Sequence, residues 1–186
     1  MKHVFLALSL LTALLSGCAS APHAGETFSA TPQVDLDRYM GRWYVIANIP
    51  YLAERGNVGS YVEYSRREDG RINDLYFFRE KTFIPGIESK AGVAKVVADS
   101  GNAYWKVSFV WPFVADYVIL YVDPDYRYAI VGHPSRDYAW IFARDMYIGD
   151  ETYARLLNVL TQQGYDARRL IKIPQRPEYL GLPGYQ

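Results

Sequence analysis

The sequence lacks a second cysteine: Cys18 is the only one among 186 residues, so the chain cannot form an internal disulfide. It also lacks an excess of either charge, because twenty basic and twenty acidic residues balance to a formal net charge of zero. No basic stripe is present, which argues against nucleic acid as a partner. Without a disulfide, the fold must be stabilised by packing alone.

Sequence motifs for catalysis and metal binding are missing as well. The chain carries neither a nucleophile elbow, a Walker loop, a HExxH pattern nor a spaced cluster of metal ligands. Of its three histidines, His3 and His23 precede position 34, and His133 stands before Pro134 and Ser135, as in a surface turn. We therefore expect no catalytic residue, no cofactor and no metal site.

The only long apolar run spans Val4 to Leu15, between a short basic start and a few small residues. It is too short to cross a membrane, and its layout is typical of a secretory signal peptide, which we assign to residues 1–17. Leu15-Ser16-Gly17-Cys18 closely resembles a bacterial lipobox, in which the cysteine is acylated and becomes the first residue of the mature protein. The alternative is an ordinary cleaved signal followed by an incidental cysteine.

The lipobox resemblance implies that Cys18 carries a diacylglyceryl group and usually a third, amide-linked chain. Two or more acyl chains hold a protein stably on a membrane, whereas one chain holds it only marginally. Ala19 follows the cysteine, in place of the aspartate that retains such lipoproteins in the inner membrane. We expect an outer-membrane anchor with the domain facing the periplasm, and a lipidated N-terminus and flexible tether over residues 18–34.

Residues 35–175 are predicted to form one all-β domain. A short helical turn at 35–40 precedes eight segments with strand character, at 43–50, 59–67, 71–81, 87–98, 103–111, 116–123, 127–133 and 137–144. Apolar and polar residues alternate most clearly over 105–109. Short links between consecutive strands indicate an antiparallel meander, and closure into an eight-stranded up-and-down β-barrel removes its exposed edges.

The links between these strands alternate in character. The second, fourth and sixth are tight polar turns, at 69–70, 100–102 and 123–125. The first, third and fifth are longer and apolar, at 50–52, 83–85 and 111–114. Alternate links lie at opposite ends of such a barrel, so one end is predicted to be closed and the other rimmed by exposed hydrophobic residues. This rim either folds over the mouth as a plug or serves as a ligand gate or contact surface, for example in a homodimer.

The chain is then predicted to leave the barrel in one amphipathic helix. Asp150 is the expected N-cap, Gly164 ends the helix, and the apolar positions between them are Tyr153, Leu156, Leu157 and Leu160. We expect this C-terminal helix to pack on the outer wall of the barrel. Residues 170–173 are predicted to form a short extra strand, and residues 176–186 a C-terminal tail.

An eight-stranded meander followed by one helix resembles the lipocalins, and three local motifs strengthen the resemblance. Gly41-Arg42-Trp43 matches the Gly-x-Trp signature at the first strand, and Asp123-Pro124-Asp125-Tyr126 resembles the second signature. Arg144 matches the single arginine of the third. All three motifs fall at the predicted closed end. With Cys18 and the segment 137–144, the chain is most similar to the bacterial outer-membrane lipoprotein lipocalins.

The resemblance implies that the barrel binds a hydrophobic small molecule, a fatty acid or a lysophospholipid, for storage, transport or maintenance of the envelope. The motif residues Gly41, Trp43, Asp123 and Arg144 are expected to be structural, with the Arg144 guanidinium stacked across the Trp43 ring at the closed end. Two alternatives stay open. One is a lipid-modifying enzyme of the lipocalin type, and the other is a scaffold or dimerising lipoprotein whose barrel is filled by its own side chains.

Ligand-binding residues are predicted from strand alternation. On the eighth strand Tyr138, Trp140 and Phe142 are expected inside, with Ala139, Ile141 and Ala143 under the helix. The other residues expected inside are Trp105, Val107 and Phe109 on the fifth strand, together with Tyr64, Phe77 and Tyr117. The alternative for each is plain core filling, because a barrel of eight strands is only just wide enough to hold one small ligand.

Overall fold

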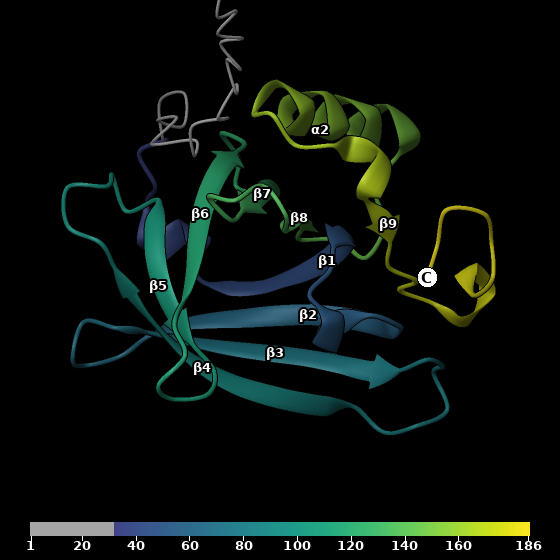
Figure 1. Cartoon of the computed structure of the whole chain (residues 1–186), viewed down its shortest axis with the longest axis horizontal. Helices are drawn as coiled ribbons and strands as arrows, with labels where there is room; N and C mark the ends of the chain where they lie inside the picture. The colour runs from purple at the N-terminus through teal and green to yellow at the C-terminus, as the bar shows by residue number, and fades with distance from the viewer. Residues whose placement is uncertain (1–31) are drawn as a thin grey trace, which may run out of the picture.

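Eight antiparallel strands close on themselves into a barrel in the computed structural model, which describes residues 32–186 (Figure 1). The strands are β1 (Gly41–Ile49), β2 (Asn57–Arg66), β3 (Ile72–Glu80), β4 (Glu88–Val96), β5 (Tyr104–Ser108), β6 (Ala115–Val122), β7 (Tyr128–Gly132) and β8 (Ala139–Ala143). Each strand pairs with the next, and β8 returns to pair with β1. The predicted eight-stranded up-and-down barrel is confirmed.

The remaining elements are short, apart from one helix. They are α1 (Leu36–Tyr39), η1 (Leu52–Glu54), α2 (Asp150–Gln162), η2 (Ala167–Arg169), β9 (Ile171–Lys172) and η3 (Pro177–Tyr179). Within residues 32–186 no helix is long and apolar enough to cross a membrane. The predicted signal peptide (1–17), Cys18 and the first part of the predicted tether lie outside the described residues.

The fifth strand is shorter than predicted, since β5 ends at Ser108 and not at position 111. The Ser108 hydroxyl donates a hydrogen bond to the Phe113 carbonyl oxygen at 2.7 Å, and the Phe113 amide donates to Val110 at 2.8 Å. Pro112, which has no amide hydrogen, cannot extend the ladder. These local bonds replace strand pairing and leave a turn at the open end of the barrel.

Trp43 is fully buried at the closed end, where its Nε1 donates to the Tyr39 carbonyl oxygen at 2.8 Å. The Arg144 guanidinium carbon lies 3.7 Å from the centroid of the Trp43 ring, as the resemblance implied. The same guanidinium donates to the carbonyl oxygens of Arg42, Arg38 and Met40, at 2.6, 2.8 and 2.9 Å. Arg144 thus ties β8 to the carbonyl end of α1 and to the start of β1 in one interaction set.

The other two motif residues shape the backbone at this end. Gly41 has a φ of +88°, in the left-handed region that favours glycine. Asp123 accepts backbone hydrogen bonds from Arg127 and Tyr128, both at 2.6 Å, and so fixes the turn between β6 and β7. Val34 also belongs here, although it was placed at the end of the tether: it is buried, and its amide donates to Gly101 at 2.8 Å.

Helix α2 packs along the outside of the barrel beside β7 and β8 (Figure 1). Leu156 and Leu160 are fully buried against the outward residues of β8, which are Ala139, Ile141 and Ala143. The predicted face of the helix is therefore confirmed. Its start differs by one residue, because Gly149 is the N-cap and Asp150 lies in the first turn, where a carboxylate favours the helix dipole.

The C-terminal segment fills a gap between β1 and β2. β1 pairs with β2 only over Gly41–Tyr44, and β9 pairs with β1 at Ala47 and Asn48. Beyond β9, the buried Gln175 Nε2 donates to the carbonyl oxygens of Val45 and Ser60, at 2.8 and 3.0 Å. The predicted tail 176–186 then folds back, and the Gln186 amide donates to the Lys172 carbonyl oxygen at 3.0 Å.

Trp43→Ala should lower the free energy of unfolding by about 3–5 kcal/mol, because it leaves a cavity beneath the barrel and removes the ring under Arg144. Arg144→Ala should cause a smaller loss. Urea unfolding measures both, and Trp111→Ala is the matched control. Trp111 is 88% exposed, so its removal should change stability by no more than about 0.5 kcal/mol. Wild-type midpoints for Trp43→Ala and Arg144→Ala would contradict this description of the closed end.

Candidate ligand-binding site

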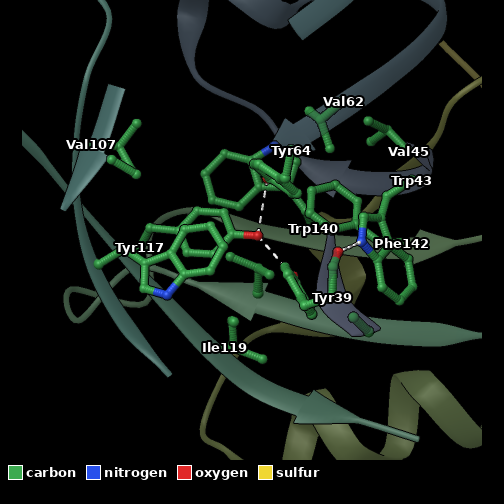
Figure 2. Packing of buried hydrophobic residues seen from close by; sticks show 14 of the residues in the cluster. Tyr39, Trp43, Val45, Val62, Tyr64, Val107, Tyr117, Ile119, Trp140 and Phe142 are labelled. Carbon is green, nitrogen blue, oxygen red and sulfur yellow. Dashed lines mark hydrogen bonds between the residues drawn. The ribbon is translucent and has the colours of Figure 1, made fainter. Parts of the chain in front are cut away.

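The barrel encloses a cavity of about 370 Å³ between the closed end and the open end. This volume lies at the lower end of the range for small-molecule sites. Most of the wall is apolar, and it is lined by Val45, Tyr51, Ala53, Glu54, Val62, Tyr64, Asp74, Tyr76, Lys90, Val107, Phe109, Val110, Ala115, Asp116, Tyr117, Trp140 and Phe142. Figure 2 shows part of this wall together with the packed floor below it.

The structure brings most of the predicted interior residues to this wall. Those that line the cavity are Trp140, Phe142, Val107, Phe109, Tyr64 and Tyr117. Strand alternation therefore predicted the inward face of β5 and β8 correctly. A ligand contact for each of these side chains stays a prediction.

Trp105 and Tyr138 were assigned to the correct side but lie outside the cavity lining. Trp105 is fully buried in the floor, where its ring stacks on Tyr117 with centroids 4.9 Å apart. The Tyr138 ring packs at a tilt of 32° against Tyr51, with centroids 3.9 Å apart, and Tyr51 itself lines the cavity. Alternation gives the side of a strand but not the depth along the barrel, which explains both differences.

The predicted inward position of Phe77 is wrong. On β3 the buried residues are Ile72, Asp74, Tyr76 and Phe78, so Phe77 points outward. Its ring stacks on Tyr61 of β2, with centroids 4.7 Å apart. Three aromatic residues in a row, at positions 76–78, offer no polar residue that would mark the solvent face.

A cluster of three tyrosine hydroxyls forms at the base of the cavity (Figure 2). The Tyr64 hydroxyl donates to Tyr117 at 3.0 Å, and the hydroxyls of Tyr39 and Tyr117 share a hydrogen bond of 2.8 Å. Burial raises the pKa of each of these phenols well above its usual value. The hydroxyls therefore stay neutral and keep their hydrogens at physiological pH.

Glu54 is an ionisable wall residue that the sequence analysis missed. It lies in η1, and its carboxylate accepts hydrogen bonds from the Tyr51 amide at 3.1 Å and from Trp140 Nε1 at 3.2 Å. Asn48 Nδ2 donates to it at 3.4 Å. Burial raises the pKa of Glu54 to about 7, against the lowering effect of these donors. Glu54 thus fixes the orientation of the Trp140 ring against the cavity.

Asp74 is the second missed residue and has fewer partners. It lies on β3 between the inward residues Ile72 and Tyr76, and it is 4% exposed. Within residues 32–186, no group hydrogen-bonds to its Oδ1. Burial, and then the charge of Glu54, raises the pKa of Asp74 to about 7. The sequence analysis considered only apolar and aromatic residues for the interior, so it passed over Asp74.

The open end carries the apolar rim that was predicted. We define this apolar rim as Leu52, Ile84, Val110, Trp111, Phe113 and Val114, all of which are exposed. Ile84 is 93% exposed and Trp111 is 88% exposed. Side chains with that exposure do not pack down over the mouth. The apolar rim surrounds the entrance and leaves the cavity beneath it unfilled.

Comparison with protein families agrees with this geometry. Residues 34–175 match the family described as the Lipocalin-like domain. Temperature-induced lipocalin-1 of Arabidopsis thaliana is 37% identical over 153 residues, covering 76% of this chain and 80% of that protein. The outer membrane lipoprotein Blc of Escherichia coli K12 is 33% identical over 178 residues, covering 94% of this chain and 98% of that protein.

Solved structures show the same fold. Insecticyanin from the tobacco hornworm Manduca sexta superposes with a TM-score of 0.64, covering 81% of this chain and 85% of the other. The two sequences are 20% identical, so this similarity concerns the fold alone.

Asp74→Asn should stabilise the protein at pH 8 and have little effect at pH 4. The folded-state pKa of Asp74 is raised to about 7, while an unfolded aspartate titrates near pH 3.9. Below pH 4 Asp74 is protonated in both states and does not lower the free energy of unfolding of the wild-type protein. Between pH 4 and pH 7 that free energy should fall by at most about 1.4 kcal/mol per pH unit. Urea unfolding at pH 4, 6 and 8 measures the difference between the two proteins.

The control is Asp69→Asn, which removes an exposed carboxylate paired with Arg71 at 2.6 Å. This variant should gain no stability at pH 8. A gain for Asp74→Asn that is the same at every pH would contradict the burial of an unpaired carboxyl group at this position.

Proposed function

The chain belongs to the lipocalin family, and on that premise we propose that its barrel binds a hydrophobic small molecule of the fatty acid or lysophospholipid class. The observation that carries the proposal is the unfilled cavity of about 370 Å³ with a mostly apolar wall. A scaffold whose barrel is filled by its own side chains would not leave this volume.

The energetics of a single acyl chain fit such a cavity. Burial of about 15 methylene groups at roughly 0.8 kcal/mol each gives on the order of 12 kcal/mol of gross stabilisation. Association costs of about 4–15 kcal/mol reduce this to a net affinity in the micromolar range. A role in the storage, transport or maintenance of envelope lipid suits reversible binding of this strength.

We further propose that the protein is anchored through Cys18 in the outer membrane, with the barrel facing the periplasm. Two observations support this proposal: the lipobox-like sequence that ends at Cys18, and the similarity to proteins named outer membrane lipoprotein Blc. A tether of about 16 residues would allow the barrel to move near the membrane while its anchor stays in place.

We propose binding without catalysis. His133 lies in the turn between β7 and β8, where its Nδ1 contacts the Ser135 hydroxyl at 2.9 Å, and it does not line the cavity.

A contact role for the apolar rim is a second candidate function, in which the rim meets a second copy of the chain. The exposure of Ile84 and Trp111 supports it, because large exposed apolar patches mark interaction surfaces.

A titration with single-chain lipids tests ligand binding. Long-chain fatty acids or lysophospholipids should displace a fluorescent fatty acid from the protein with a saturable midpoint near micromolar. Affinity should fall as the chain is shortened, by up to about 0.8 kcal/mol per methylene removed. Equal midpoints for long and short chains, or no displacement from folded protein, would contradict a cavity that binds acyl chains.

Trp140→Arg should weaken the same binding at least tenfold, because a long cationic side chain would occupy the cavity wall. Trp111→Arg makes the identical change on the apolar rim and is the matched control. It should leave affinity near the wild-type value. If both variants lose binding equally, the ligand is held at the rim and not within the barrel.

The anchor is tested by Cys18→Ala. We expect this variant to leave the outer-membrane fraction and to accumulate as soluble or unprocessed protein, since no acyl chain can be attached. Cell fractionation, with mass spectrometry of the mature N-terminus, measures both outcomes. Cys18→Ala protein that still fractionates with the outer membrane and is released by detergent would show that the lipobox assignment is wrong.

A further inference from the structure

Asp74 places an acceptor without a partner on the wall of an apolar cavity. On β3 it pairs in register with Tyr64 of β2 and Gly92 of β4, and its side chain lines the interior. It is 4% exposed, and its Oδ1 has no hydrogen-bond partner among residues 32–186. Buried polar groups in folded proteins are almost always hydrogen-bonded, so an exception at a cavity needs a physical explanation.

The groups around Asp74 do not supply the missing hydrogen. The tyrosine hydroxyls at the base of the cavity bond to one another through Tyr117, and none of them is hydrogen-bonded to Asp74 Oδ1. The Tyr76 hydroxyl donates to Ser60 at 3.2 Å. The Glu54 carboxylate accepts hydrogen bonds from Trp140 and Asn48, and its negative charge opposes the ionisation of Asp74. Among the described residues, the Asp74 Oδ1 atom is therefore left without a donor.

No cation of the described chain compensates Asp74 either. Lys90 lines the same cavity, but its ammonium group lies 5.1 Å from the centroid of the Phe78 ring. The effects that act on the Asp74 carboxyl are burial and the charge of Glu54, both of which oppose ionisation. A positive charge or a hydrogen-bond donor brought to this position by a ligand would remove the imbalance.

We propose that Asp74 forms a polar subsite deep in the cavity, which accepts a hydrogen bond from the inserted end of the ligand. The preferred ligand is then an apolar chain or ring system whose buried end carries a hydroxyl or an amine. An ammonium group would make the stronger bond, because hydrogen bonds between charged partners are stronger than neutral ones. This inference rests on the proposed function, that the barrel binds a hydrophobic small molecule, and it shifts the preferred ligand from a plain fatty acid to a chain that ends in a hydrogen-bond donor.

The subsite also predicts which ligands bind poorly. A fatty acid inserted with its carboxylate first would place a second acceptor, of like charge, against Asp74. Inserted with its methyl end first, it would leave Asp74 buried and without a partner. Either orientation is less favourable than a chain of equal length that ends in a donor. Plain fatty acids are therefore expected to be weaker ligands than matched alcohols or amines.

Calorimetric titration at pH 8 with dodecylamine, dodecanol and dodecanoate, each below its solubility limit or micelle concentration, tests this preference. Wild-type protein should bind the amine and the alcohol more tightly than the carboxylate, the amine by at least tenfold. Asp74→Leu should lose the preference for both donors. Asp74→Asn keeps an acceptor oxygen but removes the charge. Its affinity for dodecanol should therefore stay near the wild-type value, and its affinity for dodecylamine should fall at least tenfold.

Asp137→Asn is the matched control, because it removes a carboxylate that is 59% exposed in the turn at the open end. It should leave the order of the three affinities unchanged. Equal wild-type affinities for the three ligands, or an unchanged order in Asp74→Leu, would overturn the subsite while the proposed function stands. Absence of binding by all three, and by longer chains, would overturn the proposed function and the subsite together.

Discussion

The stacking of Arg144 on Trp43 is the interaction on which the rest of the structure depends. A barrel of eight strands binds a ligand only if one end is sealed while the other stays open. The guanidinium carbon lies 3.7 Å from the centroid of the buried ring, and the guanidinium donates hydrogen bonds to carbonyl oxygens of α1 and of β1. One side chain thereby joins the last strand, the first strand and the segment that covers the floor.

The volume above this floor follows from an unequal distribution of packing along the barrel axis. Tyr39, Trp43 and Trp105 fill the lower part, where all three are fully buried. Higher up, Glu54 holds Trp140 against the wall through its indole hydrogen bond, so that the ring does not fill the centre. Burial of Glu54 and Asp74 costs stability, and both lie in the part of the barrel that is not packed. Residues that are costly to the fold and face a cavity are typical of binding sites.

The sequence analysis succeeded where the pattern is local and failed where depth or distant partners decide. Segments of strand character separated by short links located all eight strands, and helical spacing identified Leu156 and Leu160 as the face packed on β8. Phe77 was placed inside because its aromatic neighbours hide the parity of β3. Gln175 fills the gap between β1 and β2 by bonding to residues more than a hundred positions away in the sequence, and no local pattern indicates these contacts. Asp74 was missed because only apolar and aromatic residues were considered for the interior.

Photo-crosslinking tests the central claim, that the ligand lies within the barrel, most directly. A single-chain lipid with a diazirine at mid-chain would be activated on the folded protein, and the modified peptides identified by mass spectrometry. The account predicts modification on the inner faces of β5, β6 and β8, at residues such as Val107, Tyr117 and Phe142. Modification confined to Trp111, Phe113 and Val114 of the apolar rim, or to α2, would contradict it.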